Sequence, residues 1–181
     1  MTGDAFQGIY KSLRRLILLR HAKAQRSAPS GEDFDRPLAP QGRADAALMG
    51  RVLAAEGLVP DRVLLSSSRR TVETWDQVRP SFPGVEGEAR KGLYLADAHT
   101  LLRALEDEDD SEVVLLIGHN PGIHALAEAL LRRGSAPPSI VERLDRGFPT
   151  ATAAVFAIDQ AGRASYDGLF LVKDHGGGGS E

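Results

Sequence analysis

Short apolar runs alternate along this chain with longer segments in which apolar residues recur every three or four positions. Three of the runs, at 15–20, 62–65 and 112–118, are continuously apolar and end at polar residues. Strands buried on both faces of a parallel sheet have this pattern, because neither face meets water. We therefore predict three buried parallel strands at these positions.

The segments between the runs have the spacing of amphipathic helices. In the first segment Ala44, Leu48 and Val52 recur on one helical face, with Pro40 near the start and Gly57 as a stop signal. The predicted helices span residues 40–56, 68–78, 97–105 and 120–134.

The last third of the chain has a different pattern. Residues 152–158 and 165–172 are strand-like, and residues 159–162 between them indicate a hairpin turn. Together these elements predict the α/β class. The expected architecture is a three-layer sandwich, with a mostly parallel central sheet flanked by helices and an antiparallel strand near the C-terminal end.

The chain contains no internal repeat and no long interior linker, so we expect a single domain over residues 14–174. Residues 1–13 lack a clear period and are expected to form a flexible leader. Residues 175–181 include four consecutive glycines and are expected to form a disordered tail.

Composition narrows the function classes. The chain has 22 basic and 25 acidic residues and a net charge of -3, which does not favour binding to nucleic acid or to a membrane surface. The apolar run at 16–19 is too short for a signal-peptide core or a membrane span. Since there is no cysteine, disulfides, thiolate metal sites and a cysteine nucleophile are excluded. A cytoplasmic location is consistent with this usage.

Each of the three predicted buried strands is followed by chemically useful side chains. Arg20 and His21 follow the first strand, residues 66–70 (Ser-Ser-Ser-Arg-Arg) follow the second, and His119 and Asn120 follow the third. Ligand sites of open α/β sheets lie beyond the carboxyl ends of the strands, so these groups are expected to converge. Taken singly, each cluster is also compatible with surface ion pairs or a helix entry.

Such a set of side chains suits phosphate chemistry. Guanidinium groups grip phosphate oxygens in a fork, and a neutral imidazole nitrogen can attack phosphorus to form a covalent intermediate. A helix that begins near Asn120 would add backbone N–H donors at the same place. Two arginines and a second histidine can neutralise the charge that develops during phosphoryl transfer, so no metal or cofactor is expected.

At this point the sequence resembles the histidine phosphatase superfamily, and in particular its SixA-type phosphohistidine phosphatases. The resemblance lies in five segments and extends over about residues 15–172. The segments are Leu-Leu-Arg-His-Ala at 18–22, Asp-Arg-Pro-Leu-Ala-Pro-Gln-Gly at 35–42, Ser-Ser-Ser-Arg-Arg-Thr-Val-Glu-Thr at 66–74, Ile-Gly-His-Asn-Pro-Gly at 117–122 and Phe-Pro-Thr at 148–150. The register of the third segment places the family's phosphate-binding arginine at Arg70 and leaves Arg69 at a variable position.

The resemblance implies a metal-independent phosphatase in which His21 is the nucleophile. Arg20, Arg70 and His119 would form the phosphate pocket, Asn120 would also contact the substrate, and Gly118 would let the backbone approach it. The expected substrate is the phosphohistidine of a signalling phosphotransfer protein. The alternatives are a phosphatase or mutase for a small phosphate ester, and a non-catalytic module that binds phosphorylated proteins.

Many relatives use a separate acid to protonate the leaving group. Asp33, Asp35 and Asp97 are the candidates here, but the first two are explained as loop carboxylates and the third as a helix cap. A phosphohistidine leaves as an imidazole, which is protonated readily near neutral pH and needs little acid assistance. His124 is expected to have a structural or surface role.

Overall fold

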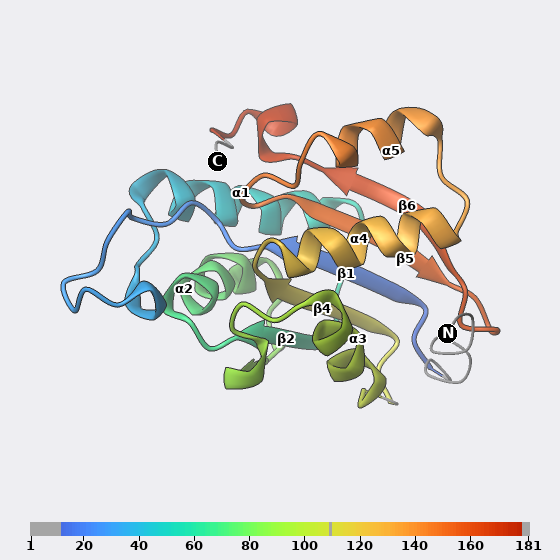
Figure 1. The fold of residues 1–181 in the computed structure, drawn as a ribbon, viewed down its shortest axis with the longest axis horizontal. Helices are drawn as coiled ribbons and strands as arrows, with labels where there is room; N and C mark the ends of the chain where they lie inside the picture. The colour runs from blue at the N-terminus through green and yellow to red at the C-terminus, as the bar shows by residue number, and fades with distance from the viewer. Residues whose placement is uncertain (1–11, 109, 179–181) are drawn as a thin grey trace.

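The computed structural model describes residues 12–108 and 110–178, which fold around a single six-stranded sheet (Figure 1). The strands are β1 (Arg15–Arg20), β2 (Arg62–Ser66), β3 (Gly87–Arg90), β4 (Val113–Gly118), β5 (Ala153–Ile158) and β6 (Ala164–Phe170). The helices are α1 (Pro40–Ala55), α2 (Arg69–Val78), α3 (Ala98–Glu106), α4 (Gly122–Arg133) and α5 (Pro138–Asp145). Within the described residues, no helix combines the length and the apolar character needed to cross a membrane.

The order of the strands in the sheet is β3-β2-β4-β1-β5-β6. The first four of these pair in parallel, whereas β5 runs antiparallel to β1 and to β6. The predicted α/β class is therefore confirmed, including the mostly parallel sheet and the antiparallel strand near the C-terminal end.

Alternate residues of the central strands pack into two separate hydrophobic cores, one on each face of the sheet. On β1, Leu16 and Leu18 pack into the core beneath α3 and α4, while Ile17 and Leu19 pack into the core beneath α1 and α2. All four side chains are fully buried, because helices cover both faces of the sheet. Figure 1 shows α3 and α4 on the near side of the sheet and α1 behind it.

The sequence pattern does not predict two of the observed elements. β3, Gly87–Arg90, lies at the sheet edge, and none of its residues is fully buried, so its sequence has no apolar run. α5, Pro138–Asp145, buries only Leu144 among its residues and therefore has no apolar stripe of the usual width.

The predicted ends of the domain need correction. The expected leader, 1–13, falls mostly outside the described residues, but Leu13 is 2% exposed and packs into the core. The expected disordered tail, 175–181, is ordered as far as Gly178, whose backbone N–H donates to the Asp45 carboxylate at 2.9 Å. Residues 179–181 lie outside the described part of the chain.

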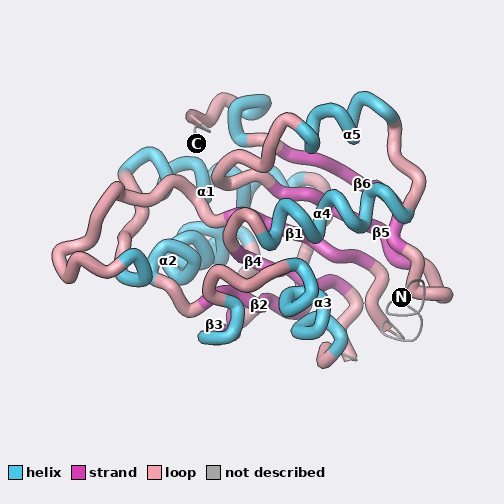
Figure 2. The backbone as a smooth tube through the Cα atoms, viewed as in Figure 1, coloured by secondary structure: helices cyan, strands magenta, loops and turns pink. Residues whose placement is uncertain are grey.

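The loops at the carboxyl ends of the parallel strands gather at one end of the molecule. Figure 2 shows the longest of them, between β1 and α1, extending well beyond the sheet. A short 3-10 helix at Asp33–Asp35 lies within this loop. These loops carry the candidate site.

Candidate active site

The register of the sheet brings the three predicted clusters together. Arg20 is the parallel partner of Gly118, and the backbone N–H of His21 donates to the carbonyl of Gly118 at 3.0 Å. The rings of His21 and His119 are consequently 5.1 Å apart between centroids. The convergence expected from strand order is present in the structure.

His21 has a defined tautomer. Its Nδ1 lies 2.8 Å from the carbonyl oxygen of Ala22, and since a carbonyl can only accept, Nδ1 carries the proton. Nε2 therefore has a free lone pair. Burial lowers the pKa of His21 well below its ordinary value, and the nearby His119, Arg70 and Arg20 act in the same direction. The imidazole is neutral at physiological pH, which a nucleophile requires.

Arg70 lies in the first turn of α2 and is 3% exposed. Its Nε–H points at the free Nε2 of His21, 3.3 Å away. The neighbouring Arg69 is exposed and donates to Glu73 one helical turn on. The expectation that Arg70 belongs to the cluster and Arg69 does not therefore agrees with the geometry.

Arg20 and Asn120 share an acceptor. The carbonyl oxygen of Phe148 accepts from the Arg20 guanidinium at 2.7 Å and from the Asn120 side-chain amide at 3.0 Å. Asn120 does not cap α4, because this helix begins at Gly122 and Pro121 occupies the capping position without a side-chain hydrogen bond. The Phe148 carbonyl is uncharged, so it orients Arg20 without neutralising it.

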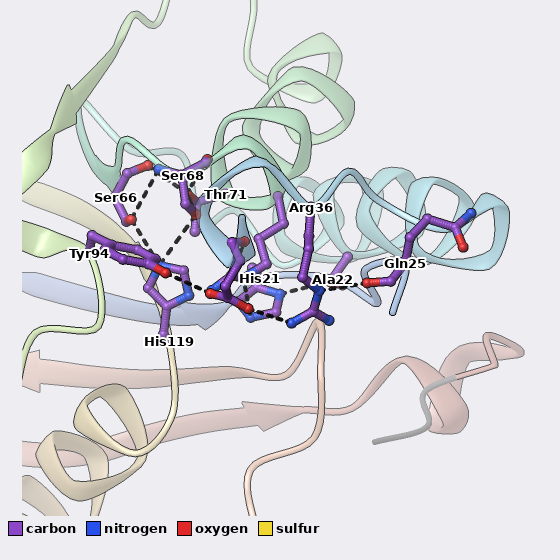
Figure 3. Close-up of polar contacts among 11 residues, drawn as sticks. His21, Ala22, Gln25, Arg36, Ser66, Ser68, Thr71, Tyr94 and His119 are labelled. Carbon is purple, nitrogen blue, oxygen red and sulfur yellow. Dashed lines mark hydrogen bonds and ion pairs between the residues drawn. The ribbon is translucent and has the colours of Figure 1, made fainter. Parts of the chain in front are cut away.

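His119 is buried against the end of β2. Its Nε2 is 2.8 Å from the Ser66 hydroxyl and 3.5 Å from that of Ser68. Dashed lines mark these contacts in Figure 3. The buried Nδ1 of His119 makes no hydrogen bond to any described residue. Burial, with Arg70 as the next cause, lowers the pKa of His119 to about 3. His119 is therefore also neutral at physiological pH.

Asp33 and Tyr94 enlarge the cluster beyond the sequence prediction. Tyr94 stands edge-on to His119 (Figure 3). Its hydroxyl donates to the Asp33 carboxylate at 2.6 Å. The same carboxylate accepts from Arg70 at 3.0 Å and from Arg36 at 2.7 Å. Asp33 lies in the loop as expected, but the sequence pattern does not predict that its carboxylate contacts Arg70 and Tyr94. No sequence signal marks Tyr94, because it contacts the cluster only through the fold.

Asp33 is held in its ionised form. The hydrogen bond from Tyr94 lowers the pKa of Asp33 most, and Arg36 and Arg70 lower it further. The bond raises the pKa of Tyr94 in turn. A carboxylate with so low a pKa has no proton to donate at neutral pH.

The other candidate acids and histidines lie outside the cluster. Asp35 accepts from the Ser30 hydroxyl at 2.8 Å, and Asp97 caps α3 by accepting from the Thr100 backbone, as predicted. His124 bonds the Leu144 carbonyl and stacks on Phe148, which agrees with a structural role.

An open cleft of about 490 Å³ contains the cluster. Its lining residues include five cationic side chains, of Arg20, Lys23, Arg26, Arg36 and Arg70, but a single carboxylate, that of Asp33. Gly118 does not line it, and a Cβ there would meet only Ile123 at an ordinary 3.5 Å. Among the described residues, no group of His, Asp or Glu side chains has an arrangement that could hold a metal ion. The cleft is suited to an oxyanion.

Residues 16–94 match the family described as the histidine phosphatase superfamily (branch 1). An uncharacterized protein of Mycobacterium tuberculosis is 34% identical over 144 residues, which cover 77% of this chain and 87% of that protein. The chain belongs to the histidine phosphatase superfamily. Five members of the cluster, Arg20, His21, Asp33, Arg70 and Tyr94, fall within the matched segment, and His119 lies beyond it.

Solved structures of this superfamily have the same fold over most of their length. A SixA structure from Agrobacterium tumefaciens is 30% identical, covering 88% of this chain and 98% of that chain with a TM-score of 0.78. The protein histidine phosphatase SixA complexed with tungstate is 25% identical, covering 89% and 99% with a TM-score of 0.72. This histidine phosphatase superfamily chain is therefore SixA-like in structure.

Proposed function

We propose that the protein is a metal-independent phosphatase that takes a phosphoryl group onto His21 from the phosphohistidine of a signalling phosphotransfer protein. The observation that carries this proposal is the unprotonated Nε2 of His21, which faces Arg70 in an oxyanion-suited cleft. A module that only binds phosphate would have no use for a nucleophile with a fixed tautomer.

The reaction proceeds in two displacements. Nε2 of His21 attacks phosphorus as the bond from phosphorus to the substrate's imidazole breaks, and that imidazole leaves with the bonding electron pair and takes up a proton from water. Water then attacks the phosphorus on His21, the bond to Nε2 breaks, and inorganic phosphate leaves. Arg20 and Arg70 neutralise the equatorial oxygens in both steps.

His119 serves as a neutral donor in this scheme. A Ser66 hydroxyl that donates to Nε2 leaves the imidazole proton on Nδ1, the nitrogen without a protein partner. Nδ1–H can then donate to a phosphate oxygen. A neutral donor that stays neutral does not repel the two arginines in the free enzyme.

The state of Asp33 favours phosphohistidine over a phosphate ester. Alkoxide leaving groups need a proton from the enzyme, but the nearest carboxyl group is ionised through its bonds to Tyr94 and two arginines. An imidazole leaving group does not need that proton.

The cleft rim favours a protein as substrate. A second shallow depression adjoins the cleft, shares Lys23, Ala24 and Arg26 with it, and includes no acidic lining residue among the described ones. Leu95, on the rim, is 52% exposed. Basic groups beside an exposed apolar side chain are suited to a partner's surface.

The test is phosphate release in EDTA from a phosphohistidine-bearing phosphotransfer domain, with the wild type, His21→Ala and, as a matched control, the exposed His99→Ala. Release by the wild type and by the control, but not by His21→Ala, supports the proposal. If the enzyme cleaves only an aryl phosphate, and this cleavage still depends on His21, the proposed substrate changes from phosphohistidine to a small phosphate ester. If the protein binds phosphate but turns over neither substrate, the proposed enzyme is instead a binding module.

A further inference from the structure

Arg70 is the most buried cation of the cleft, and its orientation is imposed by one residue. Its NH1 donates to the backbone carbonyl of Asp33 at 2.7 Å, and its NH2 donates to the carboxylate of the same residue at 3.0 Å. These two bonds fix the plane of the guanidinium and leave Nε–H directed at His21, 3.3 Å away. Asp33 thus determines where the third nitrogen points.

Asp33 is itself held on both sides. The Tyr94 hydroxyl donates to Oδ2, the oxygen that also accepts from Arg70, and Arg36 donates to Oδ1. The Phe34 ring packs edge-on against Tyr94 with centroids 5.0 Å apart, which fixes the short helix that carries Asp33. The carboxylate therefore cannot swing away without breaking several contacts.

Asp33 does not occupy all of Arg70. A guanidinium has five N–H donors, and the bonds to Asp33 and His21 use three of them. Two donors remain for an oxyanion, and Nε–H can turn from the His21 lone pair to a phosphate oxygen as the nucleophile attacks. Phosphate binding thus does not require that Asp33 leave.

We propose that Asp33 is a positioning residue, which aligns the Arg70 guanidinium with the phosphoryl group on the line of attack by His21. It neither donates a proton to the leaving group nor blocks Arg70. This inference rests on the proposed function, but the alignment can be measured by anion binding without any turnover. Tyr94 supports it by holding the carboxylate.

The experiment compares the full chain with Asp33→Ala, Asp33→Asn and the matched control Asp35→Ala, which alters a carboxylate on the same turn that does not contact Arg70. Tungstate and inorganic phosphate affinities are measured by calorimetry. We expect Asp33→Ala to weaken both by about tenfold, because a bond to a charged group is lost. Asp33→Asn, which keeps one acceptor, should lose less, and the control should stay within about twofold of the wild type.

Turnover of aryl phosphates with progressively more basic leaving groups supplies the second readout. A positioning role predicts that Asp33→Ala lowers kcat/KM by the same factor across the series. A loss that grows with leaving-group basicity, with anion affinity unchanged, would make Asp33 a general acid and overturn the proposal. If Asp33→Ala binds anions more tightly than the wild type, Asp33 blocks Arg70, and the proposal is also overturned.

Tyr94→Phe keeps the inference testable if the Asp33 variants do not fold. This variant removes one hydroxyl and retains the ring that packs on Phe34. A severalfold loss of tungstate affinity supports the positioning role, and an unchanged affinity contradicts it. If the wild type binds tungstate but cleaves no phosphorylated compound, the proposed function fails while the anion measurements still decide the role of Asp33.

Discussion

At the scale of single residues, the protonation of the two histidines is set by their surroundings. Burial is the largest cause of the lowered pKa of both His21 and His119, and the neighbouring arginines add to it. A protonated imidazole here would lie among cations in a poorly solvated site. The histidines therefore remain neutral at a pH where exposed imidazoles are already charged.

This difference can be observed by nitrogen NMR. We expect the titration midpoints of His21 and His119 both to lie well below that of a free histidine, which is at about 6.5. His21 should show a protonated Nδ1 and an unprotonated Nε2. The urea-unfolded chain, in which every histidine titrates normally, is the control. A His21 midpoint near 6.5 would contradict the assignment.

The same shift affects stability. Below about pH 6.5 the unfolded chain binds protons at these histidines that the folded chain excludes, so the free energy of unfolding falls as the pH falls. Asp33 acts in the same direction at lower pH, since its folded pKa is also depressed. Both effects make the folded chain more stable at neutral pH than in acid.

The geometry of Arg70 distinguishes it from an ordinary positive charge. Lysine at this position would keep the positive charge but lose the planar guanidinium, which bonds both Asp33 and His21. We expect Arg70→Lys to lower kcat/KM for an aryl phosphate by about 10²–10³-fold. Arg69→Lys, one position earlier and exposed, is the control and should change it by less than about twofold. Retention of more than a tenth of the activity by Arg70→Lys would contradict this role.

At the scale of elements, α2 holds the long loop between β1 and α1 in place. The Glu73 carboxylate on α2 accepts from the buried backbone N–H of Leu38 at 2.8 Å and also bonds Arg43 and Arg69. Leu38 lies where the loop returns to α1, so this contact fixes the loop that carries Asp33 and Lys23.

Removing this anchor should destabilise the fold. Glu73→Ala leaves the Leu38 N–H buried without an acceptor, and we expect it to lower the free energy of unfolding by about 1–3 kcal/mol in urea denaturation. Glu73→Gln keeps an acceptor oxygen and should cost clearly less. Equal losses for the two variants would show that the ion pairs, rather than the bond to Leu38, provide the stabilisation.

Sequence pattern was informative for elements whose sides are both covered. β1, β2 and β4 have continuous apolar runs because helices bury both faces, whereas the edge strand β3 has only partly buried or exposed residues and no such run. The order of strands then predicts that Arg20, His21, Arg70 and His119 lie together beyond the carboxyl ends of the parallel strands. Asp33 and Tyr94 could not be assigned, because 61 positions separate them and their contact depends on loop geometry.

The ordered start of the tail was missed for a related reason. Four glycines indicate flexibility from their own backbone freedom. The Asp45 carboxylate, on a distant helix, supplies an acceptor for Gly178 that local composition does not reveal.

At the scale of the whole molecule, charge is distributed unevenly. The chain has a net charge of -3, yet five cationic side chains and one carboxylate line the cleft. Arg26, at the junction of the cleft and the adjoining depression, is exposed and makes no ion pair with another described residue. An acidic partner surface would meet an attractive potential there.

Charge reversal at the rim should separate protein substrates from small ones. We expect Arg26→Glu to lower kcat/KM for a phosphorylated phosphotransfer domain by about tenfold at low salt, with the difference shrinking as salt is added. An aryl phosphate, which needs only the inner cleft, should be cleaved within about twofold of the wild-type rate. Arg51→Glu, the same charge change on α1, is the control. An equal loss on both substrates would place Arg26 in the phosphate site itself.

The bond from His21 to the Ala22 carbonyl has a consequence for isomerism. Phosphohistidine exists as two regioisomers, which differ in the ring nitrogen that bears phosphorus. Because the main chain of the next residue occupies Nδ1, the intermediate in the proposed reaction can form only on the nitrogen remote from the backbone. The regiochemistry of the enzyme's own phosphohistidine is then independent of the isomer that a partner presents. A neighbouring peptide group, and not the substrate, selects it.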